Sequence, residues 1–102
     1  MKFDWDENKA KINLTEHQIS FSEASEVFDD PWAIESFDAE HATFNELRFT
    51  SVGLVGNYLL RVTYAVTIDV DSAEVIRIIS AREAKGKDKE NYERLRKKYD
   101  RF

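Results

Sequence analysis

Between residues 58 and 68, apolar side chains occupy every second position of the chain. These positions are Leu60, Val62, Tyr64 and Val66. A period of two is typical of a β-strand with one buried face, whereas the apolar positions of an amphipathic helix recur every three to four residues. We therefore expect the chain to build a sheet in which this segment is one strand.

Further strands are predicted on both sides of this segment. They are residues 1–5, 33–37, 47–52 and 74–81. The last of them is rich in β-branched side chains, which favour strands. Gly56-Asn57 supplies turn residues just before residue 58, and residues 69–73 form a second turn. Because consecutive strands joined by short turns usually pair antiparallel, we expect an antiparallel sheet of three to five strands.

Three helices are predicted around this sheet. Asp6 is placed to cap a helix that runs to about His17. Ser20-Phe21-Ser22-Glu23 is a capping-box pattern that opens a second helix, and Asp29-Asp30-Pro31 ends it. The third helix is predicted over about 86–100. The chain thus has an α+β layout, with a small twisted sheet, two N-terminal helices and one C-terminal helix.

Helical spacing predicts which side chains of the first and last helices are buried. In the first helix these are Ala10, Leu14 and His17, with Asn13 beside them. In the last helix they are Tyr92, Leu95 and Tyr99.

Length and composition narrow the class of protein. The chain has 102 residues, which fits one domain over residues 1–102. It has no cysteine and two histidines, which excludes disulfides and argues against a zinc enzyme. No glycine-rich phosphate loop or metal-ligand cluster is recognisable, so we expect neither cofactor nor metal. No apolar run approaches a membrane span, and the acidic start lacks a signal-peptide stretch, so we expect a cytoplasmic protein without membrane contact.

Charge is unevenly distributed along the chain, whose net charge is −5. Residues 1–76 hold 5 basic and 15 acidic residues, whereas residues 77–102 hold 10 basic and 5 acidic residues. A basic C-terminal quarter indicates an anionic partner, which would be either nucleic acid or an acidic protein. The alternative is a basic helix face that is simply exposed to solvent. The candidates for binding nucleic acid are Lys85, Lys87, Lys89 and Tyr92. Tyr92 also fits a core position.

Two runs of residues resemble the BrnT family of ribonuclease toxins. They are Phe3-Asp4-Trp5-Asp6 at the start and Ile76-Arg77-Ile78-Ile79-Ser80-Ala81-Arg82 in the second half. Between and after them, similar positions include Lys9, Asn13, His17, Ser20-Phe21, Glu23-Ala24, Val27-Phe28, Asp30-Pro31, Arg48, Gly53, Ala84 and Tyr92. The resemblance covers residues 3 to about 93. The family usually has Lys-His-Gly at the first histidine, where this chain has Glu16-His17-Gln18.

The resemblance implies a RelE-like fold and the toxic half of a type II toxin–antitoxin pair. Such a toxin cleaves RNA without a metal ion and is neutralised by a DNA-binding antitoxin, BrnA. Operator DNA is then bound only through the toxin–antitoxin complex. The alternative is a non-catalytic binding module or an inactive toxin homologue, which would use the basic C-terminal region to bind an antitoxin or nucleic acid.

Metal-independent RNA cleavage needs a proton acceptor, a proton donor and cations that stabilise the phosphate in the transition state. The catalytic candidates are His17, Arg48, Arg77, Arg82 and Lys9. His17 is the proton-transfer candidate because an imidazole titrates near neutral pH, although a structural role at the helix end would also fit. His41, in a polar loop, is a weaker candidate. The arginines would bind phosphate or, alternatively, pair with the acidic residues of the chain.

If His17 and the arginines share one cleft, catalysis is favoured. If His17 packs away from Arg77 and Arg82, binding is favoured.

Overall fold

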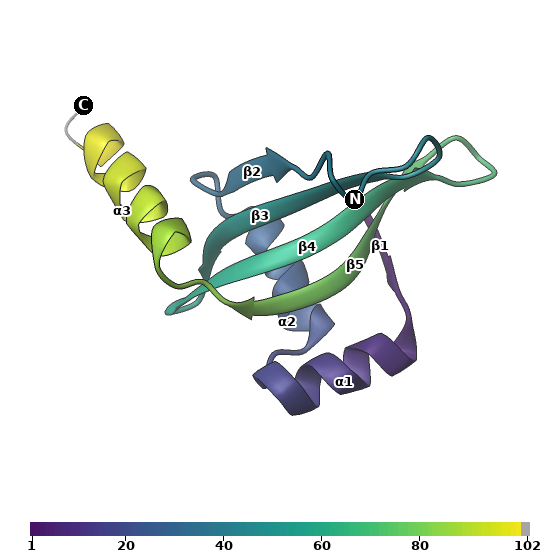
Figure 1. The fold of residues 1–102 in the computed structure, drawn as a ribbon, viewed down its shortest axis with the longest axis horizontal. Coiled ribbons are helices and arrows are strands. Elements are labelled where there is room, and N and C mark those ends of the chain that lie inside the picture. Colours follow the sequence, from purple (N-terminus) through teal and green to yellow (C-terminus); the bar gives the residue numbers. More distant parts are fainter. Residues whose placement is uncertain (101–102) are drawn as a thin grey trace.

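A five-stranded sheet in the order β1-β5-β4-β3-β2 forms the centre of the computed structural model, which describes residues 1–100 (Figure 1). Its strands are β1 Lys2–Trp5, β2 Ile34–Phe37, β3 Leu47–Val55, β4 Tyr58–Ile68 and β5 Glu74–Glu83. The predicted α+β class is therefore confirmed, as is the alternating strand over residues 58–68. The predicted domain extends to residue 102, and its last two residues lie outside the described part.

The prediction of a wholly antiparallel sheet is wrong at one edge. β1 pairs with β5 in parallel, with Lys2 opposite Val75 and Trp5 opposite Ile78, whereas the other neighbouring strands are antiparallel. Antiparallel pairing is expected for consecutive strands that are joined by a short turn. β1 and β5 are not joined by a turn, because two helices, a 3₁₀ turn and three other strands lie between them in the sequence. The sheet is mixed for this reason.

Three α-helices and one 3₁₀ turn complete the fold. They are α1 Glu7–His17, α2 Phe21–Ser25, η1 Glu26–Asp29 and α3 Lys87–Asp100. Both predicted N-caps are present: the Asp6 side chain accepts from the Lys9 N–H, and Ser20 and Glu23 form the capping box. Figure 1 shows α1 and α2 on the same side of the sheet, while α3 extends from one end. No helix among residues 1–100 is long and apolar enough to cross a membrane.

The main core lies between the sheet and the α1–α2 side. Phe21, Val27, Val62, Tyr64 and Ile78 are its largest fully buried side chains. A smaller cluster under α3 contains Val52, Ala84 and Tyr92. These two clusters fix which face each strand residue occupies, because successive side chains of a strand point to opposite faces.

Four predicted core positions are exposed instead: Leu14, His17, Leu95 and Tyr99. Leu14 is 50% exposed, while Asn13, one residue earlier, is 5% exposed and faces the sheet. On α3, Tyr92 is buried as predicted, but Leu95 and Tyr99 are 37% and 53% exposed. The reason on α3 is that the helix contacts the body chiefly at one end of β3 and is not laid along the sheet (Figure 1).

Candidate active site

Four arginines project from the sheet face opposite α1 and α2, here called the open face. They are Arg48 on β3, Arg61 on β4, and Arg77 and Arg82 on β5. Each lies next to a residue of the main core, and strand alternation therefore turns it to the other side. For example, Ile76 and Ile78 are buried and Arg77 lies between them.

A bulge in β5 allows both of its arginines to share this face. Arg77 and Arg82 are five residues apart, and in a regular strand an odd separation places side chains on opposite faces. Opposite Thr63 and Tyr64 of β4, the register shifts from Ser80 to Ile78, so Ile79 is an extra residue. Such a bulge reverses the alternation beyond it. The prediction that Arg82 follows the strand is wrong by two residues, because β4 pairs with β5 as far as Glu83.

Arg61 and Arg82 are directly opposite each other on β4 and β5. Like charges in this position repel and destabilise a sheet unless an anion lies between or beside them. The Arg61 guanidinium is partly neutralised by Asp88 of α3, with 2.8 Å between Nη1 and Oδ2. Arg82 is exposed, and no ion pair to it is formed within the described residues. The pair therefore places two positive charges on neighbouring strands of the open face, and only that of Arg61 has a carboxylate partner within residues 1–100.

Asn13 brings the end of α1 to β5 just before Arg82. Its amide nitrogen donates to the carbonyl of Ala81 at 2.9 Å, and its amide oxygen accepts from the Ala81 N–H at 3.0 Å. The same nitrogen donates to the carbonyl of Ile19 at 3.0 Å. Since β1 pairs with β5 only as far as Ile78, Asn13 acts here as a substitute for a neighbouring strand. The helix end is thereby fixed beside Arg82.

His17 and Arg82 consequently line the same hollow, which has a volume of about 400 Å³. Its other lining residues are Glu16, Gln18, Glu83 and Lys85. The His17 side chain is 40% exposed, with Nε2 lying 3.9 Å from the Glu16 carboxylate. Gln18 ends α1 with a positive φ of 60°, a conformation that favours glycine. Imidazole, guanidinium, ammonium and carboxylate groups therefore meet in one concave site.

Arg48 and Arg77 lie elsewhere on the open face, both opposite Ala65 of β4. Ala65 is four residues from Arg61, which places this row about 13 Å along the strand. Arg77 is paired with Asp4 at 2.9 Å, and Arg48 lies 3.6 Å from Glu46. The predicted arginines thus do not all converge on His17: Arg82 does, and Arg48 and Arg77 do not.

Lys9 and His41 are also separated from this hollow. Lys9 is exposed near the start of α1, about 12 Å along the helix from His17 at 1.5 Å per residue. His41 lies in the loop between β2 and β3, where its Nδ1 is 2.9 Å from the Asp38 carboxylate.

The basic C-terminal candidates have different surroundings. Lys85 lines the hollow with His17, Lys87 is exposed at the start of α3, and Lys89 lines a separate hollow beneath α3. Tyr92 is 4% exposed, and its hydroxyl donates to Asp30 at 2.6 Å and accepts from Arg96 at 3.0 Å. This burial favours the core role of Tyr92 over stacking on a base.

The contact between Asp30 and Tyr92 attaches α3 to the body. Burial acts to raise the pKa of Asp30, but hydrogen bonds from Tyr92 and from the backbone N–H groups of Leu54 and Trp32 outweigh it and lower that pKa. Burial and the bond to Asp30 raise the pKa of the Tyr92 phenol. The Asp30 carboxylate therefore carries its charge at neutral pH as an acceptor for three separate segments.

Arg61 is the functional candidate that sequence reasoning missed. A signal was present in the sequence, because the alternation over residues 58–68 turns Arg61 to the other face of the strand from the buried Leu60 and Val62. The register that faces it to Arg82 depends on the bulge at Ile79, and the sequence pattern alone does not specify that bulge. Among residues 1–100, no three His, Cys, Asp or Glu side chains are grouped so as to hold a metal ion.

The chain is thus a small α+β protein whose mixed sheet carries four arginines on its open face and brings Arg82 into one hollow with His17. The family model that matches the chain is the ribonuclease toxin BrnT of type II toxin–antitoxin systems, and it covers residues 5–88. The chain therefore belongs to the BrnT toxin family. A comparison with curated proteins gives no match.

Proposed function

We propose that this chain is an endoribonuclease toxin that cuts RNA without a metal ion in the hollow between His17 and Arg82. The observation that carries the proposal is that α1 and β5, distant in sequence, bring an imidazole, a guanidinium and the Lys85 ammonium into one concave site. Membership in a family of ribonuclease toxins supports the reaction class.

In the proposed reaction, the 2′-oxygen of the substrate attacks the adjacent phosphorus while the bond to the 5′-oxygen breaks. A base accepts the 2′-hydroxyl proton and an acid returns a proton to the leaving 5′-oxygen, giving a cyclic phosphate and a free 5′-hydroxyl. The hollow offers His17, Glu16 and Glu83 as proton carriers. Arg82 and Arg61 would stabilise the negative charge that accumulates on the phosphate oxygens.

The remaining predicted residues would extend the RNA-binding surface. Arg48 and Arg77 lie on the same open face and are proposed to bind phosphates farther along the strand. Lys87 would do so near α3, and Lys9 beside α1, while Lys89 would contact the RNA in the hollow beneath α3. These contacts would hold the RNA in position. They would not select its sequence, because phosphate contacts carry no sequence information.

As a toxin of a type II system, the chain has an antitoxin partner. We propose that this partner is BrnA-like, that it covers the His17–Arg82 hollow, and that operator DNA is bound only by the joint complex. We further propose that residues 1–102 act as one cytoplasmic domain with a fold related to RelE-type toxins.

The test is cleavage of total bacterial RNA in EDTA by protein freed of its antitoxin. His17→Ala and Arg82→Ala should each reduce the rate by about 100-fold or more, the range expected for loss of a proton-transfer or transition-state contact. Matched controls are His41→Ala and Arg94→Ala, which remove the same groups outside the hollow.

Three results would contradict the proposal in different ways. Activity that EDTA abolishes would exclude a metal-independent reaction. Equal activity in all four variants would exclude this hollow as the site. A folded wild-type protein that binds RNA and antitoxin without cutting free or ribosome-bound RNA would support the binding module, a role also consistent with Glu16 beside His17.

A further inference from the structure

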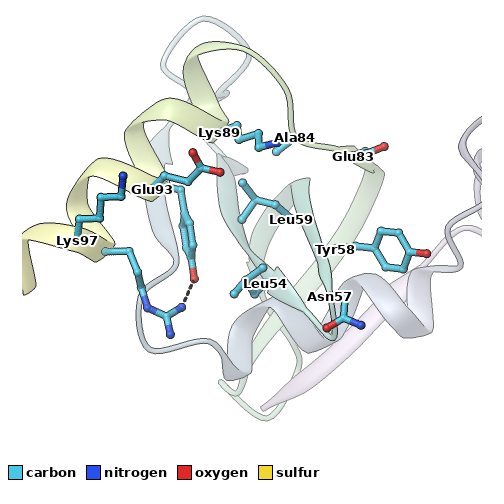
Figure 2. Close-up of a pocket in the computed structure, with 11 residues that line it drawn as sticks. Leu54, Asn57, Tyr58, Leu59, Glu83, Ala84, Lys89, Glu93 and Lys97 are labelled. Carbon is cyan, nitrogen blue, oxygen red and sulfur yellow. Dashed lines mark hydrogen bonds between the residues drawn. The ribbon is translucent and has the colours of Figure 1, made fainter. Parts of the chain in front are cut away.

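A second hollow of about 570 Å³ lies between α3 and the end of the sheet. Its floor is apolar and consists of Leu54, Leu59 and Ala84, as Figure 2 shows. Lys89 and Glu93 border it from α3 (Figure 2). The hollow is large enough for a nucleobase, and polar and charged side chains make up most of the rest of its lining.

This α3 hollow shares a lining residue with the proposed cleavage site. Glu83 lines both, and an intermediate hollow of about 360 Å³ is lined by His17, Tyr58 and Glu83. Tyr58 is 68% exposed and also lines the α3 hollow. The three hollows thus follow one another through shared lining residues from His17 to α3, and a strand of RNA bound along them would bring a base to the α3 hollow.

Lys89 and Glu93 are one turn apart on α3, where opposite charges often pair. Within residues 1–100 neither forms an ion pair or a side-chain hydrogen bond. The carboxylate and the ammonium are therefore both available at the mouth of the hollow. A partner that satisfies both must offer donors and acceptors side by side.

We propose that the α3 hollow binds a guanine base of the RNA next to the cut phosphate, an inference that rests on the proposed nuclease function. The N1–H and N2–H groups of guanine can donate together to the Glu93 carboxylate, and its O6 and N7 accept from a lysine such as Lys89. Adenine, cytosine and uracil each place an acceptor beside their donor, which repels a carboxylate. Leu54 and Leu59 cover the apolar surface of the base.

The test is a titration of ¹⁵N-labelled protein, freed of antitoxin, with 5′-GMP, 5′-AMP, 5′-CMP, 5′-UMP and 5′-IMP, which lacks the 2-amino group. We expect the amide signals of Leu54, Leu59 and Ala84 to shift with GMP, and GMP to bind about tenfold more tightly than the others. Glu93→Gln should remove that preference. Glu90→Gln is the matched control, since Glu90 is exposed on the same helix and does not line the hollow.

Equal binding of all five nucleotides would overturn the proposal. So would changes of amide signals that are confined to the His17–Arg82 hollow. The proposal would also be overturned if the amide signals of the α3 hollow shift when the antitoxin is added but not when any nucleotide is added. The two proposals fail separately. Selective GMP binding without RNA cleavage would retain the base site and reject the nuclease. Cleavage with no GMP binding at Leu59 and Ala84 would do the reverse.

Discussion

At the residue scale, Asn13 links the fold to the proposed chemistry. It is a buried polar side chain whose amide groups bond to Ala81 and Ile19, and it lies one helical turn before His17. A buried amide that loses such partners leaves backbone groups unsatisfied, at a cost of about 1–3 kcal/mol each. Its position therefore determines both stability and the placement of His17 beside Arg82.

Asn13→Ala should lower the free energy of unfolding by about 2–4 kcal/mol, because the N–H and carbonyl of Ala81 lose their partner. Urea unfolding followed by circular dichroism measures this change. Asn8→Ala, an exposed change on the same helix, should have little effect. If both variants unfold at the same urea concentration, the bonds of Asn13 do not contribute to stability.

Gln18→Gly should raise the free energy of unfolding by up to about 1 kcal/mol, because glycine adopts a φ of 60° without a Cβ penalty. Gln18→Ala serves as the control, since it shortens the side chain and keeps the Cβ. A gain in the alanine variant as large as that in the glycine variant would show that the side chain, and not the backbone conformation, is responsible.

The sequence was sufficient for most individual motifs but not for their convergence. The capping residues Asp6 and Ser20 follow from local patterns, because a cap depends on neighbours three residues away, whereas His17 is a candidate through the family resemblance. The meeting of His17 with Arg82 depends on the tertiary bonds of Asn13, and the alignment of Arg82 with Arg61 depends on the bulge at Ile79. Neither follows from periodicity.

At the element scale, the strands were predicted better than their pairing. The alternation and turn signals located β4 and β5, whose antiparallel pairing follows from the short turn between them. The parallel contact of β1 with β5 arises from packing over the whole chain. The apolar stripe of α3 predicts burial of Tyr92, Leu95 and Tyr99. In the structure only Tyr92 is buried, and its hydroxyl donates to Asp30.

Tyr92→Phe should weaken this anchor. Removing the hydroxyl deletes the bonds to Asp30 and Arg96, and a bond to a charged group contributes about 1.5–3 kcal/mol. We expect lower stability and faster hydrogen exchange in α3 than in the sheet. Tyr58→Phe is the control because Tyr58 is 68% exposed. Equal exchange in α3 of the two variants would contradict the role of the hydroxyl.

At the scale of the whole molecule, charge and shape are related. The described chain measures 44 × 30 × 25 Å, with α3 at one end of the long axis (Figure 1). The basic residues of α3 therefore lie at this end of the molecule. The sequence predicted the imbalance of charge, but the position of α3 required the structure.

Stability should fall at both extremes of pH. The pKa of Asp30 is lower in the folded protein than its ordinary value of 3.8, so its contribution is complete above that value and is lost as the pH falls through the lowered folded pKa. The pKa of Tyr92 is raised above 10.0, so its contribution is complete below that value and is lost as the pH rises through the raised folded pKa. Urea midpoints measured from pH 3 to pH 11 test both limits. Tyr92→Phe should flatten the alkaline arm, and an unchanged midpoint throughout would refute this account.

The bidentate contact of Asn13 with Ala81 has a consequence for association between copies of the chain. A strand edge with free N–H and carbonyl groups is a template on which another strand can add, and this is a common route to aggregation. β1 covers β5 only from Val75 to Ile78, and beyond that point Asn13 occupies both backbone groups of Ala81. A second molecule is therefore blocked from extending the sheet at Ala81, beside the hollow that His17 and Arg82 line.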